Sequence, residues 1–223
     1  MIKVVFVDID NTLLDFDEGA RQSMMESFDL FGLEYEDRMF DHFQTVNNQL
    51  WSSLERGELT RERLHQIRWN LIFDRLGIVA DGERFEHCFF ERLKASAVPI
   101  EGAAELMKYL SGRYIVCVAS NASHDQQSAR LQKAGMAQYV DKYFVSCTLG
   151  ADKPSKEFFD RCFEQLPGVS VDEAIIVGDS LSADMRGGKD YGIATCWYNP
   201  GLKPPVDWVD YTVTTLGEVK NIL

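Results

Sequence analysis

Six short apolar runs constrain the fold of this 223-residue chain more than any other feature. Most of them are rich in Val and Ile, and they show little alternation of polar and apolar residues. Such runs are typical of parallel strands that are buried on both faces of a sheet. We therefore predict strands at Val4–Val7, Tyr114–Ala119, Tyr143–Val145, Ala174–Val177, Ile193–Tyr198 and, from a weaker pattern, Tyr211–Val213.

Helix-like segments lie between the later runs, near residues 102–111, 123–135, 155–166 and 183–191. Strands that alternate with helices along a chain indicate an α/β fold. The sequence thus predicts a Rossmann-like, doubly wound parallel sheet with helices on its faces.

The interval between the first two predicted strands is about 100 residues long and contains no strand pattern. Apolar residues recur there at three- and four-residue steps, which is the period of amphipathic helices. They are Met39, Phe40, Phe43, Val46, Leu50 and Leu54, then Leu64, Ile67, Leu71 and Leu76, then Phe85, Phe89 and Leu93. We predict an all-α helical bundle over residues 16–97, inserted into a core formed by residues 1–15 and 98–223.

The composition excludes several kinds of partner. The formal net charge of −12 disfavours binding to nucleic acid polymers or to an anionic membrane surface. It still allows a small anionic substrate, because a bound cation can reverse the local field. No apolar stretch is long enough to span a membrane. The five scattered cysteines and the absence of a signal peptide lead us to expect a cytoplasmic protein without disulfides.

Acidic residues follow two of the predicted strands. Asp8 and Asp10 come directly after the first strand, and Asp179 and Asp184 follow the fourth. Ligands of open parallel sheets bind beyond the carboxyl ends of the strands, so these carboxylates are expected to converge. Asp8, Asp10 and Asp179 would repel one another strongly without a divalent cation among them, and hard oxygen ligands suit Mg²⁺. The sequence therefore predicts a magnesium site at this edge.

Other polar residues occupy corresponding positions. Ser120 and Asn121 follow the second strand, and Lys153 precedes the helix that leads to the fourth. A hydroxyl and a fixed positive charge are groups that hold phosphate oxygens. Each of these residues, taken singly, fits a helix cap or a turn equally well. It is their joint occurrence at strand ends that favours a phosphate site.

The motifs at these positions resemble the four motifs of the haloacid dehalogenase (HAD) superfamily. The segments concerned are Asp8-Ile-Asp-Asn-Thr12, Ser120-Asn121, Lys153-Pro154 and Gly178-Asp-Ser-Leu-Ser-Ala-Asp184. The resemblance covers essentially the whole chain, including a helical cap of the C1 type after the first strand. It implies a phosphomonoester hydrolase that works with Mg²⁺ through an aspartyl-phosphate intermediate.

The same resemblance implies a role for each matching residue. Asp8 is the expected nucleophile and Asp10 the expected general acid/base. Ser120, Asn121 and Lys153 are expected to bind phosphate. The expected metal ligands are Asp8, Asp10 through its backbone carbonyl, Asp179 and Asp184. Closure of the cap would exclude water and let cap residues contact the leaving group.

Finer motifs are similar to those of bacterial 5′-nucleotidases that act on pyrimidine nucleoside monophosphates, including noncanonical ones. These motifs are Leu14-Asp15-Phe16, Val46-Asn-Asn-Gln-Leu-Trp51, Gly187-Gly-Lys-Asp-Tyr-Gly192 and Ala194-Thr-Cys-Trp-Tyr-Asn199. One departure is Ser120-Asn121-Ala122, where that branch usually has Thr-Asn-Gly. The serine keeps the hydroxyl group, but Ala122 replaces a permissive glycine beside the expected phosphate pocket.

Several alternatives stay open at this point. The substrate could instead be phosphoglycolate or a sugar phosphate, for a phosphatase or a mutase. Dehalogenases do not need a second carboxylate at position 10, which disfavours that activity. A phospho-accepting signalling module is about half as long and lacks the insertion. Trp51 and Arg68 are candidates for contacting the leaving group, with ordinary packing and surface charge as the alternative. The oligomeric state is left open.

Overall fold

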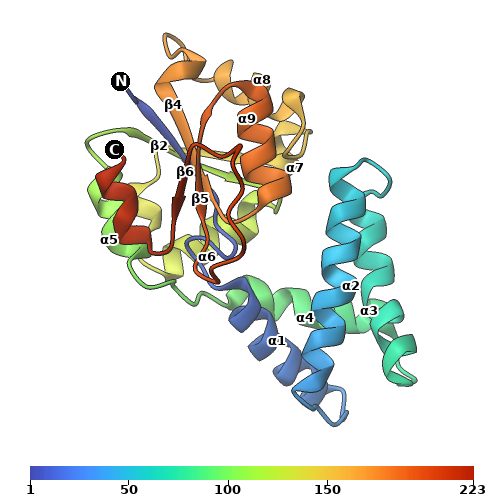
Figure 1. Ribbon diagram of the computed structural model, residues 1–223. Coiled ribbons are helices and arrows are strands. Elements are labelled where there is room, and N and C mark those ends of the chain that lie inside the picture. Colours follow the sequence, from blue (N-terminus) through green and yellow to red (C-terminus); the bar gives the residue numbers. More distant parts are fainter. The chain divides into compact units, whose positions relative to one another are not determined.

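The computed structural model describes residues 1–223, and the chain divides into two compact units (Figure 1). One unit comprises Met1–Phe16 together with Ala97–Leu223, and the other comprises Asp17–Ser96. The second unit is therefore an insertion into the first, and its ends lie one residue inside the predicted range of 16–97.

The first unit is built on a six-stranded sheet in which all strand pairs are parallel. The order is β3-β2-β1-β4-β5-β6, so β1 lies in the interior between β2 and β4. The strands are β1 (Val4–Val7), β2 (Ile115–Ser120), β3 (Lys142–Val145), β4 (Ala174–Gly178), β5 (Ala194–Tyr198) and β6 (Tyr211–Val213). The predicted α/β fold and its six strands are confirmed, with boundaries within one residue.

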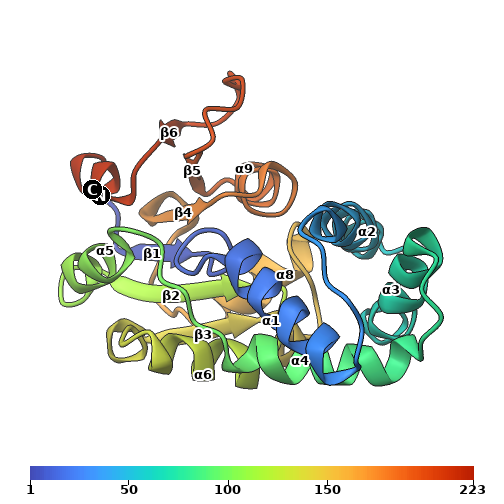
Figure 2. The ribbon, with the colours of Figure 1, turned by 90° about the horizontal axis from the view of Figure 1, so that it is seen from below.

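Helices cover both faces of the sheet (Figures 1 and 2). Alternate residues of the strands point to opposite faces, so Val5 and Val7 of β1 join one apolar core while Val4 and Phe6 join the other. The first core is completed by α5 (Ala103–Leu110), α6 (His124–Lys133), η1 (Ala137–Tyr139) and η4 (Leu216–Asn221). The second is completed by α7 (Ser146–Leu149), α8 (Lys156–Phe163), η2 (Val171–Glu173), the π-helical turn η3 (Leu181–Arg186) and α9 (Gly187–Tyr191).

Serine caps fix the points at which three helical segments begin after the sheet's carboxyl edge. The hydroxyl of Ser123 accepts a hydrogen bond from the backbone N–H of Gln126 at 3.3 Å, at the start of α6. Ser155 caps α8 and Ser180 caps η3 in the same way. Each cap satisfies a backbone N–H that has no partner within the helix. The loops before these caps carry the polar residues of the candidate site.

The inserted unit consists of four helices, α1 (Phe16–Leu30), α2 (Arg38–Glu55), α3 (Arg61–Leu76) and α4 (Gly82–Ala95). Its core is largely aromatic: the ring of Trp69 lies 5.7 Å from that of Phe43 and 4.3 Å from that of Phe85, measured between centroids. Phe28 of α1 packs edge-on against the same cluster. The predicted helical bundle is thus confirmed. No helix in either unit combines the length and apolar character needed to cross a membrane.

The buried face of α3 differs from the predicted one. The predicted stripe included Leu71, whose surface is 40% exposed. The residues that are buried are Leu64, Arg68, Trp69, Ile72 and Phe73. An arginine stands in the middle of this face, so a search for apolar spacing passed over it. The charge of Arg68 is matched inside the unit by Glu86, which makes its burial possible.

Candidate active site

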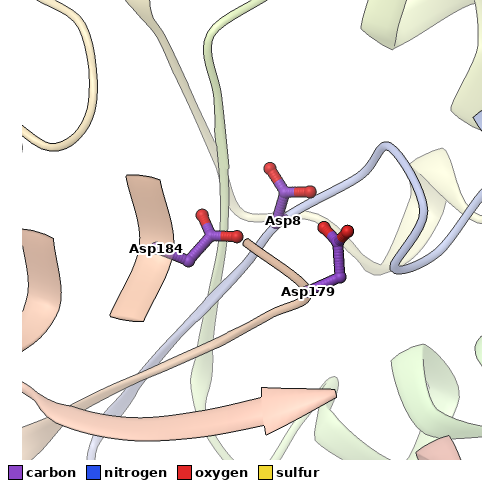
Figure 3. Close-up of side chains that lie close together, drawn as sticks. All are labelled: Asp8, Asp179 and Asp184. Atoms are coloured by element: carbon purple, nitrogen blue, oxygen red, sulfur yellow. The ribbon is translucent and has the colours of Figure 1, made fainter. Parts of the chain in front are cut away.

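Three carboxylates of the first unit gather at the carboxyl edge of the sheet. One oxygen atom from each of Asp8, Asp179 and Asp184 lies within 4.8 Å of the others. Figure 3 shows the three side chains pointing toward one another. Asp8 follows β1, Asp179 follows β4, and Asp184 belongs to η3. Their convergence results from the parallel pairing of β1 with β4, which brings both strand ends to the same edge.

Local contacts hold these carboxylates in place. The backbone N–H of Asp8 donates to the carbonyl of Val177 at 2.9 Å, and the indole N–H of Trp197 donates to the carbonyl of Asp179 at 2.9 Å. The backbone N–H of Ser180 donates to Asp184 Oδ2 at 3.1 Å. Gly178 makes room for this arrangement, because a Cβ atom there would lie 2.3 Å from Asp184 Oδ2. The glycine at the end of β4 therefore permits the close approach of Asp184.

Lys153 supplies the positive charge of the cluster. Its ammonium group donates to Asp8 Oδ1 at 2.7 Å, to Asp184 Oδ1 at 2.6 Å and to the carbonyl of Ala119 at 2.6 Å. These bonds use all three donors of the ammonium, and the side chain is 2% exposed. A phosphate oxygen can contact Lys153 only by replacing one of these partners.

The pKa values reflect an excess of negative charge. Burial raises the pKa of Asp8 well above its usual value; Lys153 partly offsets this, and the carboxylates of Asp184, Asp179 and Asp10 add to it. Burial, reinforced by Asp184, raises the pKa of Asp179 to about 7. Burial alone would lower the pKa of Lys153, but Asp184 and Asp8 outweigh it and raise that pKa. One ammonium does not balance three carboxylates.

The donor set fits a divalent cation. When the carboxylates of Asp8, Asp179 and Asp184 are ionised, Lys153 leaves two negative charges uncompensated. Carboxylate oxygens are hard ligands of the kind that Mg²⁺ and Ca²⁺ prefer, whereas the cluster contains no thiolate or imidazole. The residues could therefore hold Mg²⁺, with the lysine providing additional charge balance.

Asp10 lies outside this cluster and has different partners. One of its oxygens, Oδ2, accepts a hydrogen bond from Gln127 Nε2 at 2.7 Å. The other, Oδ1, pairs with the guanidinium of Arg130. Both partners are fully buried residues of α6. Gln127 and Arg130 were not among the predicted site residues, because nothing in the sequence separates them from the other polar residues of this helix.

Ser120 and Asn121 have separate tasks. The hydroxyl oxygen of Ser120 accepts hydrogen bonds from Gln127 Nε2 at 2.9 Å and from the backbone N–H of Ala122 at 3.2 Å, so its own hydrogen is available to a phosphate oxygen. Asn121 instead binds the backbone of Lys153: Nδ2 donates to the carbonyl at 2.9 Å, and Oδ1 accepts from the N–H at 2.8 Å. In this structure Asn121 positions the lysine rather than offering its amide to a ligand.

The two substrate candidates lie in the inserted unit. Trp51 is half-buried on α2. Arg68 is buried, and its guanidinium donates to Glu86 Oε1 at 2.6 Å, to Glu86 Oε2 at 3.0 Å and to Asn47 Oδ1 at 2.9 Å. The rings of Phe43 and Phe89 lie against it. Arg68 is therefore not a surface charge, and its guanidinium already donates to Glu86 and Asn47.

These features define an α/β core with an acidic site suited to a metal ion at the carboxyl edge of its sheet and an all-α insertion after β1. Residues 2–192 match the family model of the haloacid dehalogenase-like hydrolases. The chain belongs to this family. Together with the cluster of Asp8, Asp179 and Asp184, the family membership makes it a HAD-type phosphatase.

Known proteins of the family resemble the chain over its length. The HAD-hydrolase YfnB of Bacillus subtilis is 31% identical over 99% of this chain and 95% of its own length. The pyrimidine 5′-nucleotidase PynA of Streptococcus pneumoniae is 30% identical, covering 89% of this chain and 84% of PynA. The pyrimidine 5′-nucleotidase YjjG of Escherichia coli is 27% identical over 98% of this chain and 96% of YjjG.

A crystal structure of YfnB bound to magnesium superposes with a TM-score of 0.93 at 31% identity, covering 100% of this chain and 98% of that one. That structure reveals interdomain movement in YfnB.

Proposed function

We propose that the chain is a magnesium-dependent 5′-nucleotidase that hydrolyses pyrimidine nucleoside monophosphates through an aspartyl-phosphate on Asp8. The observation that carries the proposal is that the side chains of Asp8 and Asp10, the two carboxylates of the first motif, lie in different surroundings. Asp8 lies in the cluster beside Lys153, whereas the side chain of Asp10 lies apart with its own partners. A nucleophile and a separate proton carrier are what a two-step phosphoryl transfer to water requires.

In the first step Asp8 attacks phosphorus, the ester bond breaks, and Asp10 gives a proton to the departing ester oxygen. In the second step Asp10 takes a proton from water, which attacks the aspartyl-phosphate and releases inorganic phosphate and free Asp8. The hydroxyl of Ser120 donates to a phosphate oxygen in both steps. Lys153 neutralises charge next to Asp8, which limits the repulsion between the nucleophile and an anionic substrate.

Asp8, Asp179 and Asp184 would hold Mg²⁺ through their carboxylates, and Asp10 through its backbone carbonyl. When bound, the metal supplies positive charge that stabilises the negative charge of the transferring phosphoryl group.

The nucleotide assignment rests on relatives and on local sequence. PynA and YjjG are pyrimidine 5′-nucleotidases, whereas YfnB is described only as a HAD-hydrolase. Segments such as Ala194-Thr-Cys-Trp-Tyr-Asn199 are similar to that branch. Ala122 stands where the nucleotidase branch usually has glycine, and its N–H donates to the hydroxyl of Ser120. This difference beside the expected phosphate pocket keeps phosphoglycolate and sugar phosphates as the alternative substrates.

The chemistry is tested with Asp8→Asn and Asp10→Asn. We expect both variants to fold and to lose turnover, Asp10→Asn by about 10²–10⁴-fold, the usual contribution of a general acid/base. Acid quench of the wild type with ³²P-labelled substrate is expected to trap label on the protein, and Asp8→Asn is expected to trap none. Wild-type turnover by Asp10→Asn would show that the acid/base assignment is wrong.

The substrate class is tested by measuring kcat/KM with Mg²⁺ for nucleoside monophosphates and for sugar phosphates. We expect UMP, dUMP and dTMP to be hydrolysed with the largest values. Higher values for phosphoglycolate or a hexose phosphate would replace the nucleotidase proposal while leaving the phosphatase mechanism intact.

A further inference from the structure

We propose that Gln127 and Arg130 of α6 are positioning residues that hold the side chain of Asp10 out of the carboxylate cluster and in place for proton transfer. This inference rests on the proposed function, because it concerns how Asp10 comes to act as acid and base.

Both oxygens of Asp10 are bound by these two residues. Gln127 Nε2 donates to Oδ2 at 2.7 Å, and the guanidinium of Arg130 pairs with Oδ1. The same nitrogen of Arg130 donates to Gln127 Oε1 at 3.0 Å, so the two partners also fix each other. The result is a closed triangle of contacts, in which the orientation of the carboxylate is determined at both of its oxygens.

The two residues that α6 contributes to this triangle are buried, whereas Asp10 is partly exposed. Arg130 and Gln127 are both 0% exposed, whereas the side chain of Asp10 is 29% exposed. The positive charge of buried Arg130 strongly favours the arrangement in which the carboxylate of Asp10 stays beside it. Because the side chain of Asp10 is partly exposed, it can still exchange a proton with substrate or water.

The position of Asp10 matters because of its neighbours. Asp8 lies two residues earlier in a cluster that already contains three carboxylates and one ammonium. If the side chain of Asp10 turned into this cluster, it would become a further metal ligand and could not carry a proton. The attraction of Arg130 opposes that movement.

The same glutamine also reaches the phosphate-binding group. Gln127 Nε2 donates to the hydroxyl oxygen of Ser120 at 2.9 Å. Gln127 therefore links the expected proton carrier to the expected phosphate ligand. Loss of this second bond would affect every phosphate ester equally, whereas loss of the bond to Asp10 would affect esters according to how much protonation their leaving group needs.

That difference provides the test. Phenyl phosphate and 4-nitrophenyl phosphate have similar shapes, but phenolate is the more basic leaving group and needs a proton more. The quantity to measure is kcat/KM for both esters, because it reports the step in which the leaving group departs. We expect Arg130→Met and Gln127→Met to lower kcat/KM for phenyl phosphate at least 10-fold more than for 4-nitrophenyl phosphate, and we expect Arg130→Lys to restore much of the ratio.

Matched variants separate this effect from others. Gln126→Met removes a neighbouring buried glutamine of α6 and is expected to leave the ratio unchanged. Ser120→Ala is expected to lower both values in the same proportion. Thermal unfolding and Mg²⁺ titration of each variant show whether the fold and the metal site are retained. If Arg130→Met does not fold, Gln127→Met and Arg130→Lys still give the ratio.

Asp10→Asn distinguishes the two levels of the proposal. A selective loss with phenyl phosphate in Asp10→Asn, together with proportional losses in folded Gln127→Met and Arg130→Met, would overturn the positioning role alone. If Asp10→Asn itself showed no selectivity between the two esters, the acid/base role in the proposed function would be wrong.

Discussion

Lys153 shows how one residue links the structure of the site to its chemistry. Its ammonium group bonds to Asp8 and Asp184 and to the carbonyl at the end of β2, and it is almost completely buried. A buried lysine with so many acceptors remains charged, in keeping with its raised pKa. The residue therefore contributes both to the stability of the carboxylate cluster and to the neutralisation of an incoming phosphate.

We expect Lys153→Met to reduce kcat/KM by at least about 10²-fold, the range seen when a preorganised electrostatic group is removed. We also expect it to lower the midpoint of thermal unfolding in EDTA, because Asp8 and Asp184 lose their cationic partner. Lys156→Met is the matched control, since this exposed lysine on α8 pairs with Asp160 and lies over the ring of Tyr191 instead of contacting the carboxylate cluster. Equal effects of the two substitutions would contradict the role of Lys153.

The site residues at strand ends could be anticipated from the sequence, but the groups that orient them could not. Asp8 and Asp179 could be located because a polar residue after a buried strand is conspicuous. Gln127 and Arg130 could not, because polar residues on a helix normally face solvent and their burial depends on tertiary packing. The two bonds of Asn121 to the backbone of Lys153 were likewise invisible, since they join positions 32 residues apart.

At the level of elements, the predicted strands are confirmed because their segments are uniformly apolar. The predicted buried face of α3 was wrong because that face contains a charged residue. The strands of the core were identified because both of their faces are covered. On α3 the stripe through Leu71 was wrong, since Arg68 occupies the buried face. Glu86 receives bonds from Arg68 and from His65 Nδ1 at 2.7 Å. Burial opposes ionisation of Glu86, but these two partners outweigh it and lower its pKa.

This buried pair predicts a specific order of stabilities in the inserted unit. We expect Glu86→Leu to destabilise the protein by about 3–5 kcal/mol, because it leaves the charge of Arg68 buried without its partner. Arg68→Met is expected to cost less, since Glu86 keeps His65. The double variant is expected to be more stable than the sum of the single effects predicts. Urea denaturation of the four proteins measures these differences, and additive effects would contradict the pairing.

At the level of the whole molecule, the metal site and the folded state are linked. The cluster exists only when β1, β4 and η3 are assembled, because each contributes one carboxylate or the loop that carries it. A cation that binds this assembly and not the unfolded chain stabilises the fold. The raised pKa values of Asp8 and Asp179 show that, without the cation, the ionised cluster is a source of instability.

The sign of the resulting pH dependence follows from these pKa values. Asp179 has a pKa of about 7 in the folded protein and an ordinary value of 3.8. Its contribution to stability is fully present below the ordinary value, where the group is protonated in both states. It is lost as the pH rises through the folded value. In EDTA we therefore expect Asp179→Asn to gain stability relative to the wild type between pH 5 and pH 8.

Magnesium is expected to reverse this trend, because it binds the ionised carboxylates. At a concentration of 100 times its Kd it would stabilise the fold by about 2.7 kcal/mol. For a chain of this size that corresponds to a rise in Tm of roughly 5–10 °C. We expect the rise to be larger at pH 8 than at pH 5 and to shrink in Asp179→Asn, as measured by differential scanning calorimetry with and without Mg²⁺. Equal rises at both pH values, or an unchanged rise in the variant, would mean that magnesium acts elsewhere than at the cluster of Asp8, Asp179 and Asp184.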